Sequence, residues 1–180
     1  MRIISGTFKG RRITAPKKLP VRPTTDMAKE GLFNILNNHY YFDEISVLDL
    51  FSGTGNISYE FASRGVSSIT AVDANADCVR FIEKTASGLE MKITAQKLDV
   101  FSYLERNPSK SDIIFADPPY NMDLSDFEKI HELVFEKELL LPEGRLIIEH
   151  AKQMKLSHLT HFISERKYGG SVFSFFQNTM

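Results

Sequence analysis

VLDLFSGTGN, residues 47–56, joins an apolar run to a helix-forming segment through a loop that contains two glycines. Gly53 and Gly55 permit a tight turn and a close backbone approach by a ligand, and the start of the following helix offers unpaired N–H groups. A dinucleotide-binding loop would have a third glycine at position 58, where this chain has Ser58. The stretch therefore predicts a strand, a ligand-binding loop and a helix, and it matches an NAD site only in part.

The same alternation of apolar runs and helical patterns continues along the chain. Strands are expected at 46–51, 68–72, 92–95, 112–116 and 145–149, and helices from Thr24 or Thr25 to about Asn38 and at about 56–64, 75–87, 99–106 and 125–138. Repeated strand-then-helix order predicts an α/β fold with a mostly parallel sheet and right-handed crossovers. The runs 159–166 and 171–177 are joined by Gly169-Gly170, which predicts a C-terminal antiparallel hairpin.

Acidic residues occur where successive strands are expected to end. Asp73 ends the second strand, where its carboxylate could accept both hydroxyls of a ribose, and Asp99 follows the third, where it could accept from the amine of an adenine. Each could instead cap a helix. Because ligands of open parallel sheets bind beyond the carboxyl ends of the strands, the acids and the glycine loop together predict an adenosine pocket. Asp49 could orient the loop or meet an ammonium group.

The stretch FADPPYNMD, residues 115–123, ends a buried strand in an unusual way. Asp117 follows the apolar run 113–116, and two prolines then remove two backbone donors and fix two φ angles. Tyr120 is therefore held rigidly just beyond the strand. The stretch is typical of a binding or catalytic site, but it also fits a surface Pro-Pro turn with a capping Asp, and by itself it leaves both interpretations open.

The N-terminal segment is basic, although the chain as a whole has a net charge of only −1. Seven cations precede the first acid, Asp26: Arg2, Lys9, Arg11, Arg12, Lys17, Lys18 and Arg22. Gly6 and Gly10 between two short β-prone runs predict a small basic β-hairpin. Such asymmetry favours a polyanionic partner, and the alternative is a solvated basic surface strand.

The composition limits the class of protein. With 180 residues, of which 42% are apolar and 25% charged, the chain is typical of one soluble globular domain. Cys78, the single cysteine, excludes an internal disulfide, and its apolar helical surroundings predict a buried structural thiol. His158 and His161 lack a third ligand at zinc spacing. No signal peptide or membrane-spanning run is apparent, so we expect a cytoplasmic protein, and we expect it to be a monomer.

The motifs together resemble a known family. LDLFSGTG (48–55), AVDA (71–74), LDV (98–100) and DPPY (117–120) resemble the class I S-adenosylmethionine-dependent methyltransferases, and particularly those that methylate exocyclic amines. The N-terminal motifs RIISG (2–6), KGRR (9–12), RPTTD (22–26) and LFNIL (32–36), with SRG (63–65), are similar to the RsmD family, which methylates guanine N2 in bacterial small-subunit (16S) ribosomal RNA. Members usually have arginine where this chain has Met27 and Lys29, and a small glycine at Ser58, a change that we expect to alter only helix packing.

The resemblance implies a Rossmann-like domain, residues 23–180, behind a basic RNA-contacting extension, residues 1–22, and it implies roles for individual residues. The implied cofactor-binding residues are Asp49, Phe51, Gly53, Thr54, Gly55, Asp73, Ala74, Asp99, Val100 and Asp117. The implied catalytic residues are Asp117, Pro118 and Tyr120, and the implied RNA-binding residues are Arg2, Lys9, Arg11, Arg12 and Arg22. No metal is implied, and the RNA partner could be naked or part of an assembled small-subunit particle.

Three other functions fit parts of the sequence. An adenine-N6 or cytosine-N4 DNA methyltransferase also uses DPPY, but the N-terminal motifs argue against it. A non-catalytic RNA-binding module of the same fold is disfavoured because Gly53, Gly55, Asp73 and the stretch 117–120 are intact. A NAD-dependent oxidoreductase is the weakest alternative, because its glycine fingerprint is incomplete.

Overall fold

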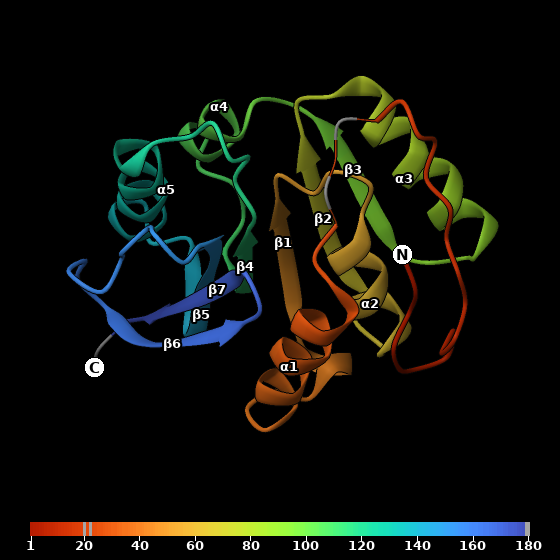
Figure 1. The fold of residues 1–180 in the computed structure, drawn as a ribbon, viewed down its shortest axis with the longest axis horizontal. Coiled ribbons are helices and arrows are strands. Elements are labelled where there is room, and N and C mark those ends of the chain that lie inside the picture. Colours follow the sequence, from red (N-terminus) through yellow and green to blue (C-terminus); the bar gives the residue numbers. More distant parts are fainter. Residues whose placement is uncertain (20, 22, 179–180) are drawn as a thin grey trace.

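The alternating patterns form a seven-stranded sheet with helices on both faces in the computed structural model, which describes residues 1–19, 21 and 23–178 (Figure 1). The strands are β1 (Ser46–Leu50), β2 (Ser68–Asp73), β3 (Ile93–Lys97), β4 (Ser111–Ala116), β5 (Leu140–Ala151), β6 (Phe162–Tyr168) and β7 (Ser171–Gln177). The helices are α1 (Asp26–Asn37), the 3₁₀ turn η1 (Phe42–Glu44), α2 (Asn56–Ser63), α3 (Ala76–Gly88), α4 (Val100–Glu105) and α5 (Leu124–Glu136).

The strand order determines where a ligand can bind. The sheet runs β3-β2-β1-β4-β5-β7-β6, and the first five of these strands are parallel, whereas β7 is antiparallel to both of its neighbours. The chain moves outward from β1 to β3 and then returns to β4 on the other side of β1. This reversal opens a crevice at the carboxyl ends of β1 and β4. The predicted α/β class, parallel sheet and C-terminal hairpin are confirmed.

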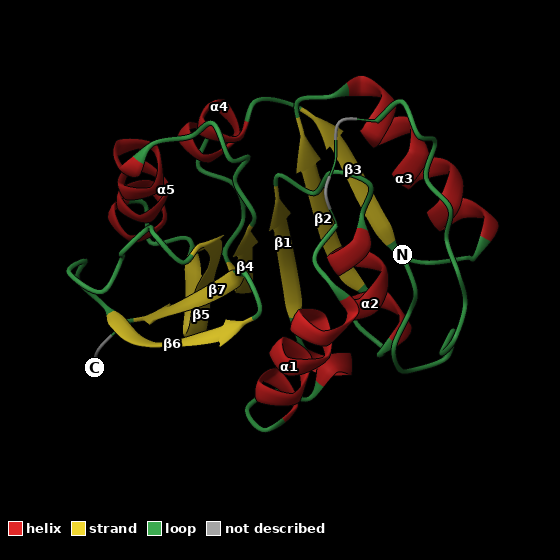
Figure 2. Ribbon diagram, viewed as in Figure 1, coloured by secondary structure: helices red, strands yellow, loops and turns green. Residues whose placement is uncertain are grey.

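Adjacent residues in the central strands face opposite layers, because side chains alternate along a strand. Val47 and Ile113 are buried in the core formed with α1 and α2. Leu48 and Ile114 are buried in the core formed with α4 and α5. Figure 2 shows these two groups of helices in red on either side of the yellow strands. Burial on both faces explains why these strands are continuously apolar in sequence.

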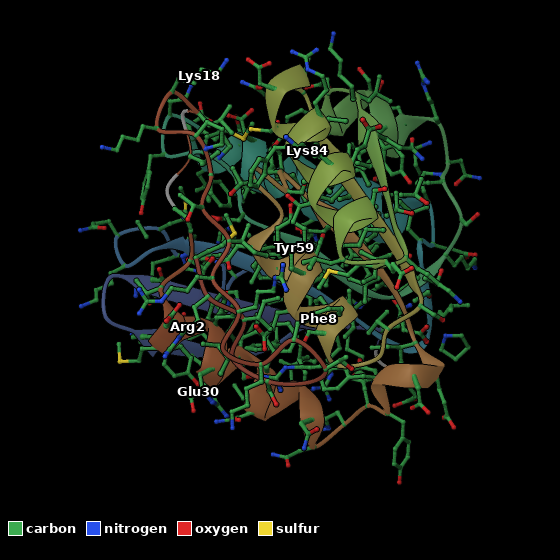
Figure 3. The ribbon with its side chains drawn as sticks, turned by 90° about the vertical axis from the view of Figure 1, so that its right-hand side faces the viewer. Arg2, Phe8, Lys18, Glu30, Tyr59 and Lys84 are labelled. Atoms are coloured by element: carbon green, nitrogen blue, oxygen red, sulfur yellow. The ribbon has the colours of Figure 1, made fainter. Side chains whose placement is uncertain are left out.

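The N-terminal segment runs beside α2 and α3 and packs against them (Figure 3). Its two arms meet through a single antiparallel bridge between Arg2 and Arg12. Ile3 and Ile13 are nearly fully buried in a third core cluster with side chains of β2, α2 and α3. The predicted basic hairpin is thus present as a pair of arms that share one bridge. The proposed division after residue 22 stays a proposal, because Arg22 lies outside the described residues.

Two predicted strands differ from the structure by more than two residues at one end. The strand expected at 145–149 is the middle of β5, which starts at Leu140 and ends at Ala151. Pro142 and Gly144 disfavour a continuous strand by local propensity, but in the structure they lie within β5, where its register with β4 shifts. The strand expected at 159–166 lies at Phe162–Tyr168.

Candidate active site

The loop after β1 is held against the end of β2. Its backbone turns through left-handed conformations at Phe51 (φ 57°), Gly53 (φ 53°) and Gly55 (φ 87°), which is the N-cap of α2. A side chain at Gly55 would also collide with Tyr59, whose ring lies 2.8 Å from the position of a Cβ. The Gly53 N–H donates to Asp73 Oδ2 at 2.8 Å. The loop is therefore fixed before any ligand binds.

A cavity of about 1050 Å³ opens at the carboxyl ends of the parallel strands. The predicted cofactor-binding residues line it, except Gly55. They are Asp49, Phe51, Gly53, Thr54, Asp73, Ala74, Asp99, Val100 and Asp117. The cavity is also lined by the segment before α1 and by the turn between β6 and β7. Segments far apart in the sequence thus enclose one space, as the topology predicts.

The charge of this cavity has one sign. Five acids line it, namely Asp49, Asp73, Asp99, Asp117 and Glu149, whereas none of the lining residues that the structure describes is Lys or Arg. Like charges in a partly desolvated space repel one another and favour protonation. The cavity is consequently suited to a ligand that carries positive charge.

Asp49 is the most completely buried of these acids, with 1% of its surface exposed. Burial raises the pKa of its carboxyl to about 7, although the bond from the Ser58 hydroxyl opposes this shift and the Asp73 charge adds to it. Ser58 Oγ donates to Asp49 Oδ2 at 2.6 Å. The expectation that Ser58 alters only helix packing was therefore wrong, because its hydroxyl is the described partner of a buried acid.

Asp73 and Asp99 serve the fold as well as lining the cavity. Asp73 accepts N–H bonds from Gly53 and Asn75, one on each carboxylate oxygen, both at 2.8 Å. Asp99 is the N-cap of α4 and accepts from the Ser102 N–H at 2.9 Å. A carboxylate oxygen can accept a further bond, so a capping role and a ligand-binding role are compatible. The structure thus shows the capping role for Asp99, assigns the N-cap of α3 to Asn75 and not to Asp73, and leaves the ligand-binding roles of both acids as predictions.

Asp117 lies at the end of β4, inside the cavity. Burial raises the pKa of its carboxyl, and the nearby charges of Glu149 and Asp49 raise it further. Pro118 is buried and Pro119 is exposed, and Tyr120 lies at the rim with 73% of its surface exposed. The surface-turn interpretation of this stretch does not fit a half-buried Asp117 that lines the cavity near two other acids.

Glu149 was missed by the sequence reasoning. It lies on β5, and the pairing of Ala116 with Ile148 places it beside Asp117 in the neighbouring strand. It is buried, and its carboxylate accepts from Thr24 Oγ1 at 2.7 Å. The strand-end rule that identified Asp73 and Asp117 could have found Glu149, because the predicted strand at 145–149 also ends in an acid.

Met27 and Lys29 have separate roles in the structure. Met27 is 59% exposed and lines the cavity. Lys29 is only 1% exposed and donates to Asn56 Oδ1 at 2.8 Å and to the Arg2 carbonyl at 2.6 Å. It also lies 3.4 Å from the Glu60 carboxylate. Lys29 therefore ties α1 to α2 and to the N-terminal segment and is not available to a ligand.

The predicted RNA-binding residues are not gathered in one place. Arg2 forms an exposed ion pair with Asp26 at 3.1 Å, and Lys9 is exposed at the turn between the two arms. Arg11 and Arg12 line a second cavity beside α3, described below. Arg22 lies outside the described residues.

The remaining chemically reactive side chains have structural surroundings. Cys78 is buried, as predicted, and burial raises the pKa of its thiol to about 11. Among residues 1–19, 21 and 23–178, no group of His, Cys, Asp and Glu side chains has an arrangement that could hold a metal ion. In the same part of the chain, no helix combines the length and apolar character needed to cross a membrane.

Known proteins resemble this chain over nearly its whole length. Residues 1–177 match the family described as Conserved hypothetical protein 95. The Bacillus subtilis protein named "Putative rRNA methyltransferase YlbH" is 32% identical over 161 residues, which cover 87% of this chain and 85% of that protein. The Haemophilus influenzae ribosomal RNA small subunit methyltransferase D is 28% identical, over 87% of this chain and 81% of its own. The solved structure of the Escherichia coli "Putative methyltransferase yhhF" superposes with a TM-score of 0.85 at 25% identity, covering 98% of this chain and 97% of that chain.

Proposed function

The chain belongs to the Conserved hypothetical protein 95 family, and from this premise we propose that it transfers a methyl group from S-adenosylmethionine to the N2 amine of a guanine in small-subunit ribosomal RNA. The name of the Haemophilus influenzae relative supports the substrate class. The observation that supports this cofactor is the charge of the cavity. S-adenosylmethionine has a positively charged sulfonium and an ammonium group, and the five acids that line the cavity attract both. The anionic pyrophosphate of NAD would be repelled by the same lining.

The residues at the end of β4 address the main chemical difficulty. When bound, S-adenosylmethionine supplies a methyl group on a positively charged sulfur. The lone pair of an exocyclic base amine is delocalised into the ring, so the site must localise it. The Asp117 carboxylate and the Pro118 carbonyl accept the two amine hydrogens and direct the lone pair toward the methyl carbon. As the N–C bond forms and the C–S bond breaks, the amine gains positive charge and then releases one proton to solvent.

The protonation of Asp117 depends on what fills the cavity. Burial and the charges of Glu149 and Asp49 raise the pKa of its carboxyl. Positive charge in the cavity opposes this shift, so a bound cofactor is expected to lower the pKa of Asp117 and to favour its charged form. A charged acceptor forms stronger hydrogen bonds than a neutral one.

Tyr120 is placed to contact a base that has left its stack. Its ring lies at the cavity rim and is largely exposed, so a planar base can cover it. Stacking of this kind contributes about 1–3 kcal/mol per base in nucleic-acid sites. The two prolines before it limit the freedom of the ring.

The proposal is tested by mapping the methylated nucleoside. Unmodified small-subunit ribosomal RNA, assembled 30S-type particles and duplex DNA are each incubated with labelled S-adenosylmethionine, and the products are digested and identified by mass. We expect N2-methylguanine from RNA or from particles. Methylated adenine or cytosine from DNA would contradict the proposal in favour of a DNA methyltransferase, and no methyl transfer to any of the three would favour a non-catalytic module.

The role of Asp117 is tested by single-turnover rates at saturating cofactor and RNA. We expect Asp117→Ala to reduce methyl transfer by far more than tenfold while the protein stays folded and binds RNA normally, because RNA affinity depends mainly on phosphates. In the same assay, Tyr120→Ala removes the ring and should reduce the rate of methyl transfer severely. Tyr120→Phe is its matched control, because it keeps the ring, and should reduce the rate only mildly. A folded Asp117→Ala protein within about tenfold of wild type, a barrier change near 1.4 kcal/mol, would exclude the mechanism.

A further inference from the structure

A second cavity, which we call the α3 groove, lies between the N-terminal segment and α3. Its volume is about 620 Å³. It is lined by Arg11, Arg12, Ile13, Thr14, Pro16, Lys18, Leu19, Asp77, Arg80, Phe81, Lys84, Thr85, Gly88 and Leu89. Figure 3 views this face, with the N-terminal segment running beside α3 and with Lys18 and Lys84 on either side of the space between them.

The rim of the α3 groove is strongly basic. Five of its lining residues are cations, and only Asp77 is acidic. Asp77 forms an ion pair with Arg80, so the acid is already neutralised within α3. For the other four cations, Arg11, Arg12, Lys18 and Lys84, no ion pair with a described residue is found. The groove therefore has uncompensated positive charge, the opposite of the acidic cavity next to it.

The floor of the α3 groove is apolar. Ile13 and Leu19 are nearly fully buried beneath it, and Phe81 and Leu89 are partly exposed. A basic rim above an apolar floor that contains an aromatic ring is the pattern of sites for single-stranded nucleic acids, in which cations contact phosphates and rings contact bases. A duplex presents its phosphates but keeps its bases stacked inside, so it could use the rim but not the floor.

The α3 groove adjoins the candidate active site. Leu19 lines both cavities, and the chain continues from it through Val21, Pro23 and Thr24, which line the acidic cavity. In α3 the adjacent residues Asp77 and Cys78 line one cavity each. A strand of RNA that lies in the groove therefore borders the acidic cavity on the side of β2 and α3, and Asp117 and Tyr120 line the same cavity beyond the end of β4.

We propose that the α3 groove binds a single-stranded stretch of RNA that flanks the target nucleotide, with Lys18 and Lys84 contacting phosphates and Phe81 contacting a base. This inference rests on the proposed function for the identity of the polyanion. It adds α3 to the RNA-binding surface, which the sequence placed in the N-terminal segment alone. It also gives Phe81 a role besides its packing.

The experiment measures binding of a fluorescein-labelled single-stranded RNA oligonucleotide at several salt concentrations, without cofactor. We expect Lys84→Ala to weaken binding and to reduce the slope of log affinity against log salt by about 0.7, the value for one phosphate contact to a single strand. The control is Lys110→Ala, which removes the same charge from an exposed residue at the amino end of β4 and should change neither quantity. Phe81→Leu, which keeps the floor apolar but removes the ring, should weaken binding without changing the slope.

Two outcomes would overturn the inference. One is unchanged affinity and slope for Lys84→Ala with single-stranded RNA. The other is a Lys84→Ala protein that no longer binds assembled 30S-type particles but still binds naked RNA, which would indicate a protein partner in the groove. Because binding is read without cofactor, it is independent of catalysis. Failure of the wild-type protein to methylate RNA would contradict the proposed function and leave the result for the groove unaffected.

Discussion

At the scale of single residues, Asp49 links the sequence to the chemistry of the cavity most directly. It is the one polar residue in the otherwise apolar β1 stretch 47–50, and its side chain faces the cavity without leaving the core. Ser58 donates its only hydroxyl proton to it. With a pKa of about 7, Asp49 changes charge in the physiological range, so its state responds to any positive group that enters the cavity.

We predict that protonation of Asp49 makes the stability of the empty protein depend on pH. Its pKa is about 7 in the folded chain against an ordinary value of 3.8, so the folded state holds a proton that the unfolded state has released. This contribution is fully present below pH 4 and is lost as pH rises to 7, and its upper limit is about 4 kcal/mol. Denaturant unfolding at several pH values should show a flatter profile for Asp49→Asn than for wild type. Identical profiles would contradict the assigned pKa.

The sequence predicted the positions of the site residues better than their partners. Asp73 and Asp117 follow from a rule about strand ends, which needs only local pattern and strand order. The bond from Ser58 to Asp49 and the burial of Lys29 depend on how helices pack against the sheet, and no local pattern encodes that packing. Side chains whose role is set by distant neighbours are therefore the ones that the sequence left unexplained.

At the scale of elements, the contact between the N-terminal segment and α2 is unusually polar for a buried interface. The Glu60 carboxylate accepts the backbone N–H groups of Ile4 and Ser5 at 2.9 and 3.1 Å, and it also pairs with Arg64. Ser63 Oγ donates to the Ser5 carbonyl at 2.6 Å. The two arms bond to each other through backbone groups of Met1, Ile3, Gly10, Arg11 and Ile13. Side chains and a carbonyl of α2 accept the N–H groups between the arms and thereby hold the basic segment in place.

We predict that Gly6→Ala disrupts this contact and that Gly10→Ala does not. Both glycines have φ of +83°, so alanine costs roughly 1–2 kcal/mol of backbone strain at either position. A Cβ at Gly6 would lie 1.8 Å from the Ser63 carbonyl oxygen, whereas a Cβ at Gly10 has nothing within 4 Å. Denaturant unfolding should therefore show a clearly larger loss of stability for Gly6→Ala. Equal losses in the two variants would mean that the segment does not pack on α2 in this way.

The sequence predicted most elements and misjudged those that depend on long-range pairing. The parallel strands and their helices follow from hydrophobic periodicity, and the observed bounds differ from the predicted ones by one or two residues in most cases. The start of β5 was missed because Pro142 and Gly144 are strand breakers by local propensity. Pairing with β4 overrides that propensity, and the register shift there absorbs the irregularity.

At the scale of the whole molecule, the net charge of −1 conceals two neighbouring cavities of opposite sign. The acidic cavity at the strand ends fits a cationic cofactor, and the basic α3 groove fits a polyanion. Both are bordered by the segment that leads from the N-terminal arms to α1. If both proposals hold, this one stretch of chain lies between the cofactor and the RNA.

We predict that S-adenosylhomocysteine stabilises the protein and that NAD does not, because the cavity favours the ammonium of the first and repels the pyrophosphate of the second. At one hundred times its Kd, a ligand of the folded state adds about 2.7 kcal/mol. For a chain of this length that corresponds to a rise in Tm of roughly 5–11 °C. Thermal unfolding with and without each ligand provides the measurement, and stabilisation by NAD alone would contradict the proposed cofactor.

Asp73→Ala provides the matched variant for this measurement. Because Asp73 also accepts the N–H bonds of Gly53 and Asn75, its loss should lower the Tm of the empty protein as well as the affinity for the ligand. The informative quantity is therefore the shift in Tm that S-adenosylhomocysteine produces in each protein, and not the Tm itself. We expect the shift to shrink strongly in the variant at a fixed ligand concentration. A shift as large as in wild type would show that the ligand does not contact Asp73, and the pocket would then have to be placed elsewhere in the molecule.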